Sequence, residues 1–299
     1  MAEIAVELAQ ALADRQSAGV SGQTKPRSVA RGDGWTVADV ICTRGPQDRP
    51  YEERHVENAI AIVQAGSFEY RSPTGRELMT AGSLLLGNPG DAFECAHRHS
   101  EGDRCVSFWY APDYFERLAA DAGLAAGNRR FTVPRVPPFR ELSPIAAHAS
   151  AGAQWGADVA WEELAITLAV RAMRIASGVS PSRSGLPLNA EARLACAVRA
   201  IDGGAETSLT LGALAREAGL SPYHFLRTFK LVVGVTPHQY VLRARLREAA
   251  SRLAAGGARV VDVALDSGFG DVSNFNHAFR AEFGMSPRAM RRALQGSRE

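Results

Sequence analysis

The sequence has few cysteines and no long apolar stretch. Four cysteines are scattered among 299 residues, too few for a disulfide-stapled scaffold, and they favour a reducing, cytoplasmic location. No apolar run reaches the roughly 18 residues that a membrane-spanning helix needs. The N-terminus contains acids and lacks the basic start and apolar block of a secretory signal. We therefore expect a cytoplasmic protein that does not associate with a membrane.

Motifs of several common enzyme classes are also missing. The sequence contains no G-x-S-x-G, no Walker loop and no dinucleotide-binding fingerprint. Its hydrophobic share of 46% and charged share of 22% are those of an ordinary globular protein. The length allows two domains. We therefore expect a two-domain protein that is not an enzyme and has no catalytic residues.

One pattern occurs twice near the C-terminus. Residues 225–237 read FLRTFKLVVGVTP and residues 275–287 read FNHAFRAEFGMSP. Each copy has two phenylalanines four positions apart, then a basic residue, a glycine and a Thr-Pro or Ser-Pro pair. The similarity extends upstream, to 211–219 and 260–268. Each copy is too small to bury a core alone, so we expect the two to pack through a shared element.

Each copy predicts a helix, a tight glycine turn and a second helix. The first unit has helices at 210–218 and 222–233, and the second has helices at 260–267 and 272–282. A long helix at about 237–254 joins them. In a helix-turn-helix unit the second helix can enter the DNA major groove. The joining helix would be about 27 Å long, close to the separation of adjacent major-groove segments.

The second helix of each unit has an apolar face and a polar face. Phe225 and Phe229 lie four residues apart and are expected to pack inward. The polar positions between them then point outward, where Arg, Asn, His and Ser side chains hydrogen-bond base edges or phosphates. Basic residues outnumber acidic ones in residues 189–299, as expected for a DNA-binding half. The predicted DNA contacts are Tyr223, Arg227 and Lys230 in the first unit and Ser273, Asn274, His277 and Arg280 in the second.

Residues 190–293 resemble the DNA-binding region of AraC/XylS-type transcription regulators. The stretch GFGDVSNFNHAFRAEFGMSPRAMRR is similar to the most diagnostic part of that family. The resemblance implies a sequence-specific regulator, commonly an activator. Leu226 and Val272 fall at base-reading positions where polar side chains often stand, so they would contact thymine methyl groups or make no base contact. By position, the resemblance implies base reading by Tyr223, Leu226 and Arg227 in the first unit and by Val272, Ser273, Asn274 and His277 in the second.

The N-terminal half predicts strands followed by helices. Short runs rich in Val, Ile, Phe and Tyr lie between turn residues over about 35–110, and they predict a small antiparallel β sandwich or barrel. Helical periodicity follows at 113–120, 141–152 and 161–175. This half resembles, more weakly, the cupin-like effector domain of many such regulators. The fold class is thus α+β, with a cupin-like β-barrel or sandwich, flanking helices and an all-α C-terminal domain.

Composition sets the expected domain boundaries. We expect residues 1–30 to form a tail or a short amphipathic helix, and residues 31–178 to form an effector-binding and dimerisation domain. Residues 179–188 are rich in Gly, Ser and Pro and are expected to form a linker, which the DNA-binding domain at 189–299 follows. The apolar stripe on 161–175 must be covered by a second subunit or by the β domain of its own chain. The expected partners are double-stranded DNA, a small-molecule or metal effector, RNA polymerase and a second copy of the chain.

The stretch ECAHRHSEGDRC is a candidate metal site. Cys95, His97 and His99 alternate, so on a strand they share one face. Cys105 joins them if a hairpin pairs odd with odd residues. Two thiolates and two imidazoles suit tetrahedral Zn²⁺ or a softer transition metal, and Cys42 could add a ligand from another strand.

Other interpretations of these residues stay open. The thiols could sense oxidants or electrophiles, or the cysteines could simply be buried. His55, between Glu53 and Glu57, is expected on a surface strand. The resemblance to cupins argues against an enzyme metal centre, because Phe93 stands near where a cupin ligand histidine is often found. The competing functions are a cupin-type metal oxygenase or isomerase fused to a DNA-binding unit, and a constitutive DNA-binding protein whose N-terminal domain only oligomerises.

Overall fold

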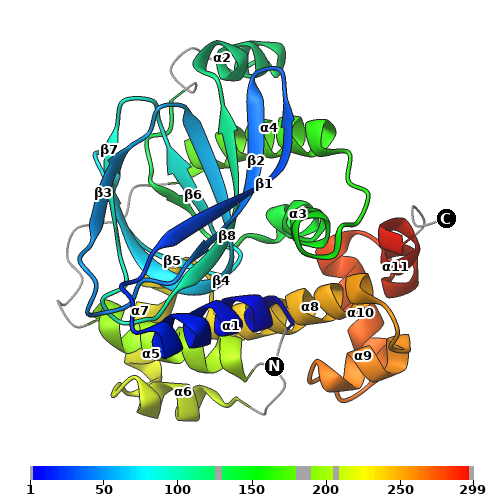
Figure 1. The fold of residues 1–299 in the computed structure, drawn as a ribbon. Helices are drawn as coiled ribbons and strands as arrows, with labels where there is room; N and C mark the ends of the chain where they lie inside the picture. The colour runs from blue at the N-terminus through cyan, green and yellow to red at the C-terminus, as the bar shows by residue number, and fades with distance from the viewer. Residues whose placement is uncertain (1–2, 125–129, 180–189, 205–208, 296–299) are drawn as a thin grey trace.

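The computed structural model describes residues 3–124, 130–179, 190–204 and 209–295 (Figure 1). The predicted linker at 179–188 lies outside these residues except for residue 179. The strands gather in one part of the molecule, and the C-terminal helices lie beside them (Figure 1). No helix in the described ranges is long and apolar enough to span a membrane.

The N-terminal half is an antiparallel β structure in which the long strand β4 (Asn58–Ser72) belongs to two sheets. Its first part pairs with β8 and β6, and its second part pairs with β5 and β7. A register irregularity between Val63 and Ala65 separates these parts, as a β-bulge does where a strand bends. The other strands are β1 (Thr24–Gly32), β2 (Trp35–Cys42), β3 (Tyr51–Arg54), β5 (Gly75–Thr80), β6 (Leu84–Gly87), β7 (Ala92–Ala96), β8 (Asp103–Tyr110) and β9 (Arg135–Val136).

This arrangement confirms the α+β fold class and the antiparallel sandwich. Two details differ from expectation. β5 forms in GRELMT, which had the composition of a turn. β1 extends the sheet back to Thr24, before the expected boundary at residue 31. A helix α1 (Glu3–Ala18) precedes β1, which agrees with one of the two expectations for residues 1–30. β1 is polar and mostly exposed at the sheet edge, so it lacks the alternation that marks a half-buried strand.

The helices α2 (Pro112–Asp121), α3 (Ser143–Trp155) and α4 (Trp161–Gly178) share one core with the sheet. The centre of the stripe on α4 is buried, including Leu168 and Met173, in one core with Phe108 and Phe115. The Tyr110 hydroxyl donates a 2.8 Å hydrogen bond to the carbonyl of Ala165. Of the two coverings expected for this stripe, the structure therefore shows the β domain of the same chain.

The C-terminal half is helical, and α8 (Pro237–Ala255) forms its axis. Tyr240 and Ala244 of α8 belong to the core of the first unit, and Leu246 and Leu253 belong to the core of the second. The two units therefore pack through a shared helix, as the repeat predicted. The other helices are α5 (Ala190–Gly203), α6 (Leu211–Glu217), α7 (Pro222–Val233), α9 (Val260–Asp266), α10 (Val272–Phe283) and α11 (Pro287–Gln295).

Side-chain caps explain where these helices begin. The side chains of Thr210, Ser221, Thr236 and Asp271 each accept a hydrogen bond from a backbone N–H in the first turn of the helix that follows. At Thr236 the cap is reciprocal, because Gln239 accepts from the Thr236 N–H. α7 and α10 both end at a glycine with positive φ, which only glycine adopts without strain. Residues close together in the sequence therefore determine where these helices begin and end.

Candidate DNA-binding surface and ligand pocket

The two repeat copies bury the same positions. Phe225, Phe229, Phe275 and Phe279 are all 0% exposed. Within each pair the ring centroids are 5.4 Å apart. These phenylalanines fix the rotation of α7 and α10 about their axes, so the residues between them must face solvent. The prediction that the phenylalanines pack inward is confirmed.

The residues predicted to contact DNA lie on the outer faces of α7 and α10. Arg227, Lys230 and Arg280 form no side-chain hydrogen bond or ion pair with any described residue, so their charges are free for phosphates or bases. Val272 is half-buried, which limits its reach. The exposed members are Tyr223, Leu226, Arg227, Lys230, Ser273, Asn274, His277 and Arg280. Their contacts with DNA stay a prediction.

The basic residues of α8 are engaged inside the protein. Arg243 donates a 2.7 Å hydrogen bond to the Pro138 carbonyl and pairs with Glu282 at 3.2 Å. Arg247 lies 3.5 Å from the Asp202 carboxylate. α8 therefore acts as a scaffold that holds the two units together.

A segment of the N-terminal half, residues 135–143, contacts the ends of both outward-facing helices; we call it the strap. At one end, buried Arg135 donates hydrogen bonds of 2.7 and 3.1 Å to the carbonyls of Val232 and Val233 in the last turn of α7. Arg135 also pairs with Glu77 of β5 at 2.9 Å. The last carbonyls of a helix have no partner within it and carry partial negative charge, so the arginine satisfies them directly.

The other end of the strap reaches the second unit. The Ser143 hydroxyl donates a hydrogen bond to the carboxylate of Glu282, in the last turn of α10. The same carboxylate pairs with Arg243, which in turn bonds to Pro138 of the strap. The strap therefore ties both helix-turn-helix units to the β domain, and neither the repeat nor the sheet pattern predicted it.

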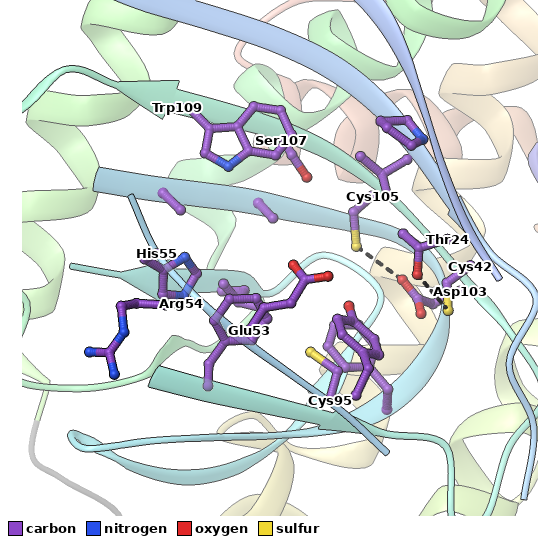
Figure 2. A pocket seen from close by; sticks show the side chains of 18 of the residues that line it. Thr24, Cys42, Glu53, Arg54, His55, Cys95, Asp103, Cys105, Ser107 and Trp109 are labelled. Carbon is purple, nitrogen blue, oxygen red and sulfur yellow. Dashed lines mark hydrogen bonds between the residues drawn. The ribbon is translucent and has the colours of Figure 1, made fainter. Parts of the chain in front are cut away.

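A cavity of about 480 Å³ opens between the two sheets (Figure 2). Small-molecule sites in proteins commonly have a volume of this order. Three thiols and three acids, Glu53, Glu57 and Asp103, lie on its wall among apolar and aromatic side chains. Its lining includes Cys42, Tyr51, Phe68, Phe93, Cys95, Asp103, Cys105, Ser107 and Trp109.

The structure brings together only part of the predicted metal cluster. β7 ends at Ala96, so the strand alternation does not reach the histidines, and His99 is exposed. β7 and β8 do not pair with each other, so the expected hairpin register is wrong. His97 turns inward instead, and its Nε2 lies 2.7 Å from Oδ1 of Asp103.

The surroundings of the three pocket thiols raise the pKa of each thiol. Burial, aided by the Asp103 charge, raises the pKa of Cys42 to about 12. Burial also raises the pKa of Cys95 and of Cys105, and the Asp103 carboxylate adds to both shifts. Redox-sensing cysteines need a lowered pKa. This environment therefore disfavours the oxidant-sensing interpretation.

His55 lies in the pocket wall, and the expectation that it sits on the surface is wrong. Its ring stacks on Phe93 with centroids 4.2 Å apart, and its Nε2 lies 2.9 Å from the Tyr70 hydroxyl. Burial lowers the pKa of His55 to about 4. Its neighbours Glu53 and Glu57 gave it a polar context in the sequence, which concealed that the side chain turns inward.

The lowered pKa of His55 makes stability depend on pH. The unfolded chain binds a proton at His55 below about pH 6.5, and the folded chain binds it only below about pH 4. The free energy of unfolding should therefore fall as pH drops through this window, by about 3 kcal/mol from this group. Urea unfolding of wild type and His55→Gln from pH 7 to 4 measures the difference, and parallel curves would contradict the assignment.

The sequence was compared with known proteins. Residues 214–293 match the family model described as a helix-turn-helix domain. The HTH-type transcriptional activator AarP of Providencia stuartii is 33% identical over 87 residues, which cover 29% of this chain and 64% of AarP. The HTH-type transcriptional activator RhaS of Escherichia coli O139:H28 is 39% identical over 84 residues, which cover 28% of this chain and 30% of RhaS. The similarity thus spans less than two thirds of either relative.

Several solved structures of one protein, ToxT, extend over most of the chain. The fatty-acid-bound ToxT of Vibrio cholerae covers 89% of this chain and 98% of its own at 14% identity, with a TM-score of 0.36. That score is too low for the likeness to bear on the pocket. The helix-turn-helix match and the two activators instead coincide with the repeat that carries the AraC/XylS resemblance, and they confirm it there. Residues 214–293 of this chain therefore match a helix-turn-helix domain, and they lie within the part that resembles AraC/XylS-type regulators.

Proposed function

We propose that this protein is a sequence-specific DNA-binding transcription regulator of the AraC/XylS type. The observation that carries the proposal is the pair of matching outward faces on α7 and α10, each set by two fully buried phenylalanines. On each face the arginine or lysine side chains are unpaired within the described residues. A helix of 19 residues, about 28 Å long, separates the two units. This spacing suits two successive major-groove segments.

The pocket between the sheets is the proposed site for a small-molecule effector. It is mostly lined by apolar and aromatic side chains. Its polar lining includes Glu53, Arg54, His55, Glu57, Asp103 and Ser107. An occupant would contact both sheets, and β5 and β9 carry the Glu77–Arg135 pair that holds α7. A change in the packing of these strands would reach the first DNA-binding unit through the strap. Effector binding should therefore change DNA affinity, and a titration of DNA binding with candidate effectors tests this. RNA polymerase and a second copy of the chain are further proposed partners.

The test of DNA reading uses the full chain. Binding sites are selected from a random duplex library and then footprinted. We expect two protected segments one helical turn, about 10 base pairs, apart, with affinity that falls steeply as salt rises. Arg227→Ala should cost about 1–3 kcal/mol and relax one base position, whereas Lys230→Ala should weaken all sequences equally.

Two results would contradict this proposal. A single protected segment of about 5 base pairs would mean that only one unit reads DNA. An unchanged base-preference profile for Arg227→Ala would reduce that residue to a phosphate contact. Leu231→Ala is the matched control, because this side chain is exposed at 51% on the same helix and is not among the predicted DNA contacts.

A further inference from the structure

Three side chains able to ligate a metal converge at the wall of the pocket. A thiol sulfur of Cys42, a ring nitrogen of His97 and a carboxylate oxygen of Asp103 all lie within 4.8 Å of one another. Cys42 ends β2 and Asp103 begins β8, and the register of these strands places the two residues directly opposite. His97 reaches them from the segment after β7. The side chains of His97 and Asp103 are 1% and 8% exposed.

Asp103 differs from the other buried acids of the protein. Among the described residues, each of the other buried acids pairs with an arginine. The side-chain partners of Asp103 are instead the His97 ring and the Cys105 thiol, which donates a hydrogen bond to Oδ2 at 3.3 Å. A buried carboxylate without a counter-charge is costly. The acids that pair with arginine are Asp39, Glu69, Glu77, Asp91 and Glu282.

The His97 ring lies beside Asp103 but is incompletely partnered. Its Nε2 lies 2.7 Å from Oδ1 of Asp103, and its Nδ1 is buried and has no hydrogen-bond partner among the described residues. A neutral imidazole ligates metals through either ring nitrogen, so a nitrogen donor lies next to the carboxylate. A metal cation would supply the positive charge that Asp103 lacks.

We propose that Cys42, His97 and Asp103 bind a Zn²⁺ ion, with Cys105 as the fourth donor. Two sulfurs, one nitrogen and one oxygen suit tetrahedral zinc, whereas magnesium and calcium prefer oxygen ligands alone. Figure 2 shows Cys42, Asp103 and Cys105 together on one side of the pocket. A bound zinc ion displaces the proton of a coordinating thiol. The site would join β2, β8 and the segment after β7, and it does not depend on the proposed DNA-binding function.

The test uses the full chain, freed of metal with a chelator and then titrated with Zn²⁺ against a chromogenic competitor. We expect one equivalent to bind. Cys42→Ser and His97→Gln should each weaken binding more than about 100-fold, since even groups that only orient a ligand cost 10–100-fold. Cys95→Ser removes a buried thiol of the same pocket, and His99→Gln removes the exposed histidine, so both controls should bind zinc like wild type.

Cobalt gives a readout that does not depend on any variant. Co²⁺ bound to wild type should show thiolate-to-cobalt charge-transfer absorption and the intense visible bands of tetrahedral geometry. Absence of these bands, or of zinc uptake by wild type, would overturn the proposal whatever the variants do. Wild-type affinity in a folded His97→Gln protein, or equal losses in Cys95→Ser and Cys42→Ser, would also overturn this ligand set. Circular dichroism establishes that each variant is folded.

Discussion

Replacing Arg135 with methionine should destabilise the protein by about 3–5 kcal/mol, because removal of one partner leaves a buried charge alone. Arg135 is 5% exposed and Glu77 is 8% exposed. The substitution would also leave the carbonyls of Val232 and Val233 without their arginine donor. The midpoint of urea unfolding, followed by circular dichroism, measures the loss.

A control and a rescue make this result specific. Arg117→Met breaks an ion pair with Asp113 in which both side chains are exposed, so it should leave the urea midpoint almost unchanged. Adding Glu77→Gln to Arg135→Met removes the orphaned charge and should recover part of the lost stability. If Arg135→Met costs no more than Arg117→Met, the strap does not hold α7 in the way its hydrogen bonds indicate.

Truncating one core phenylalanine should disable one DNA-binding unit and spare the other. Phe229→Ala and Phe279→Ala each remove a fully buried ring, so we expect each to cost about 3–5 kcal/mol. Phe229 lies in the core of the first unit, which includes Tyr240 and Ala244 of α8. Phe279 lies in the core of the second unit, which includes Leu246 and Leu253 of α8. Phe229→Ala should therefore remove protection of one DNA segment and Phe279→Ala that of the other. Denaturation and footprinting of both variants measure these effects.

The matched control for this pair is Leu231→Ala. Leu231 is 51% exposed on α7, so its truncation should change stability by no more than about 0.5 kcal/mol. Loss of both protected segments in either phenylalanine variant would show that the two units fold as one. That outcome would contradict the division into two cores.

The helix-turn-helix units could be predicted because their signals are local. The phenylalanines four apart, the capping residues and the terminal glycines act within a few positions of one another, and the phenylalanines are buried as expected. The outer positions of α7 and α10 follow from the same periodicity. The strands with alternating or continuous apolar residues, β2, β4 and β8, were predicted for the same reason. The polar edge strand β1 and the short strand β5 lack that pattern and were missed.

The pocket and the strap depend on pairings between residues far apart in the chain. Cys42 and His97 could be noticed in the sequence, but Asp103 joins them through the register of β2 against β8. His99 was included because an alternation was extended past the real end of β7. The periodicity of α4 predicted a buried face but not the element that covers it. In the structure the sheet of the same chain covers this face. Arg135 has no local signal at all, because its partners come from β5 and from the end of α7. Local periodicity thus determines the helices and their outward faces, whereas long-range packing decides which side chains meet in the pocket and at the domain interface.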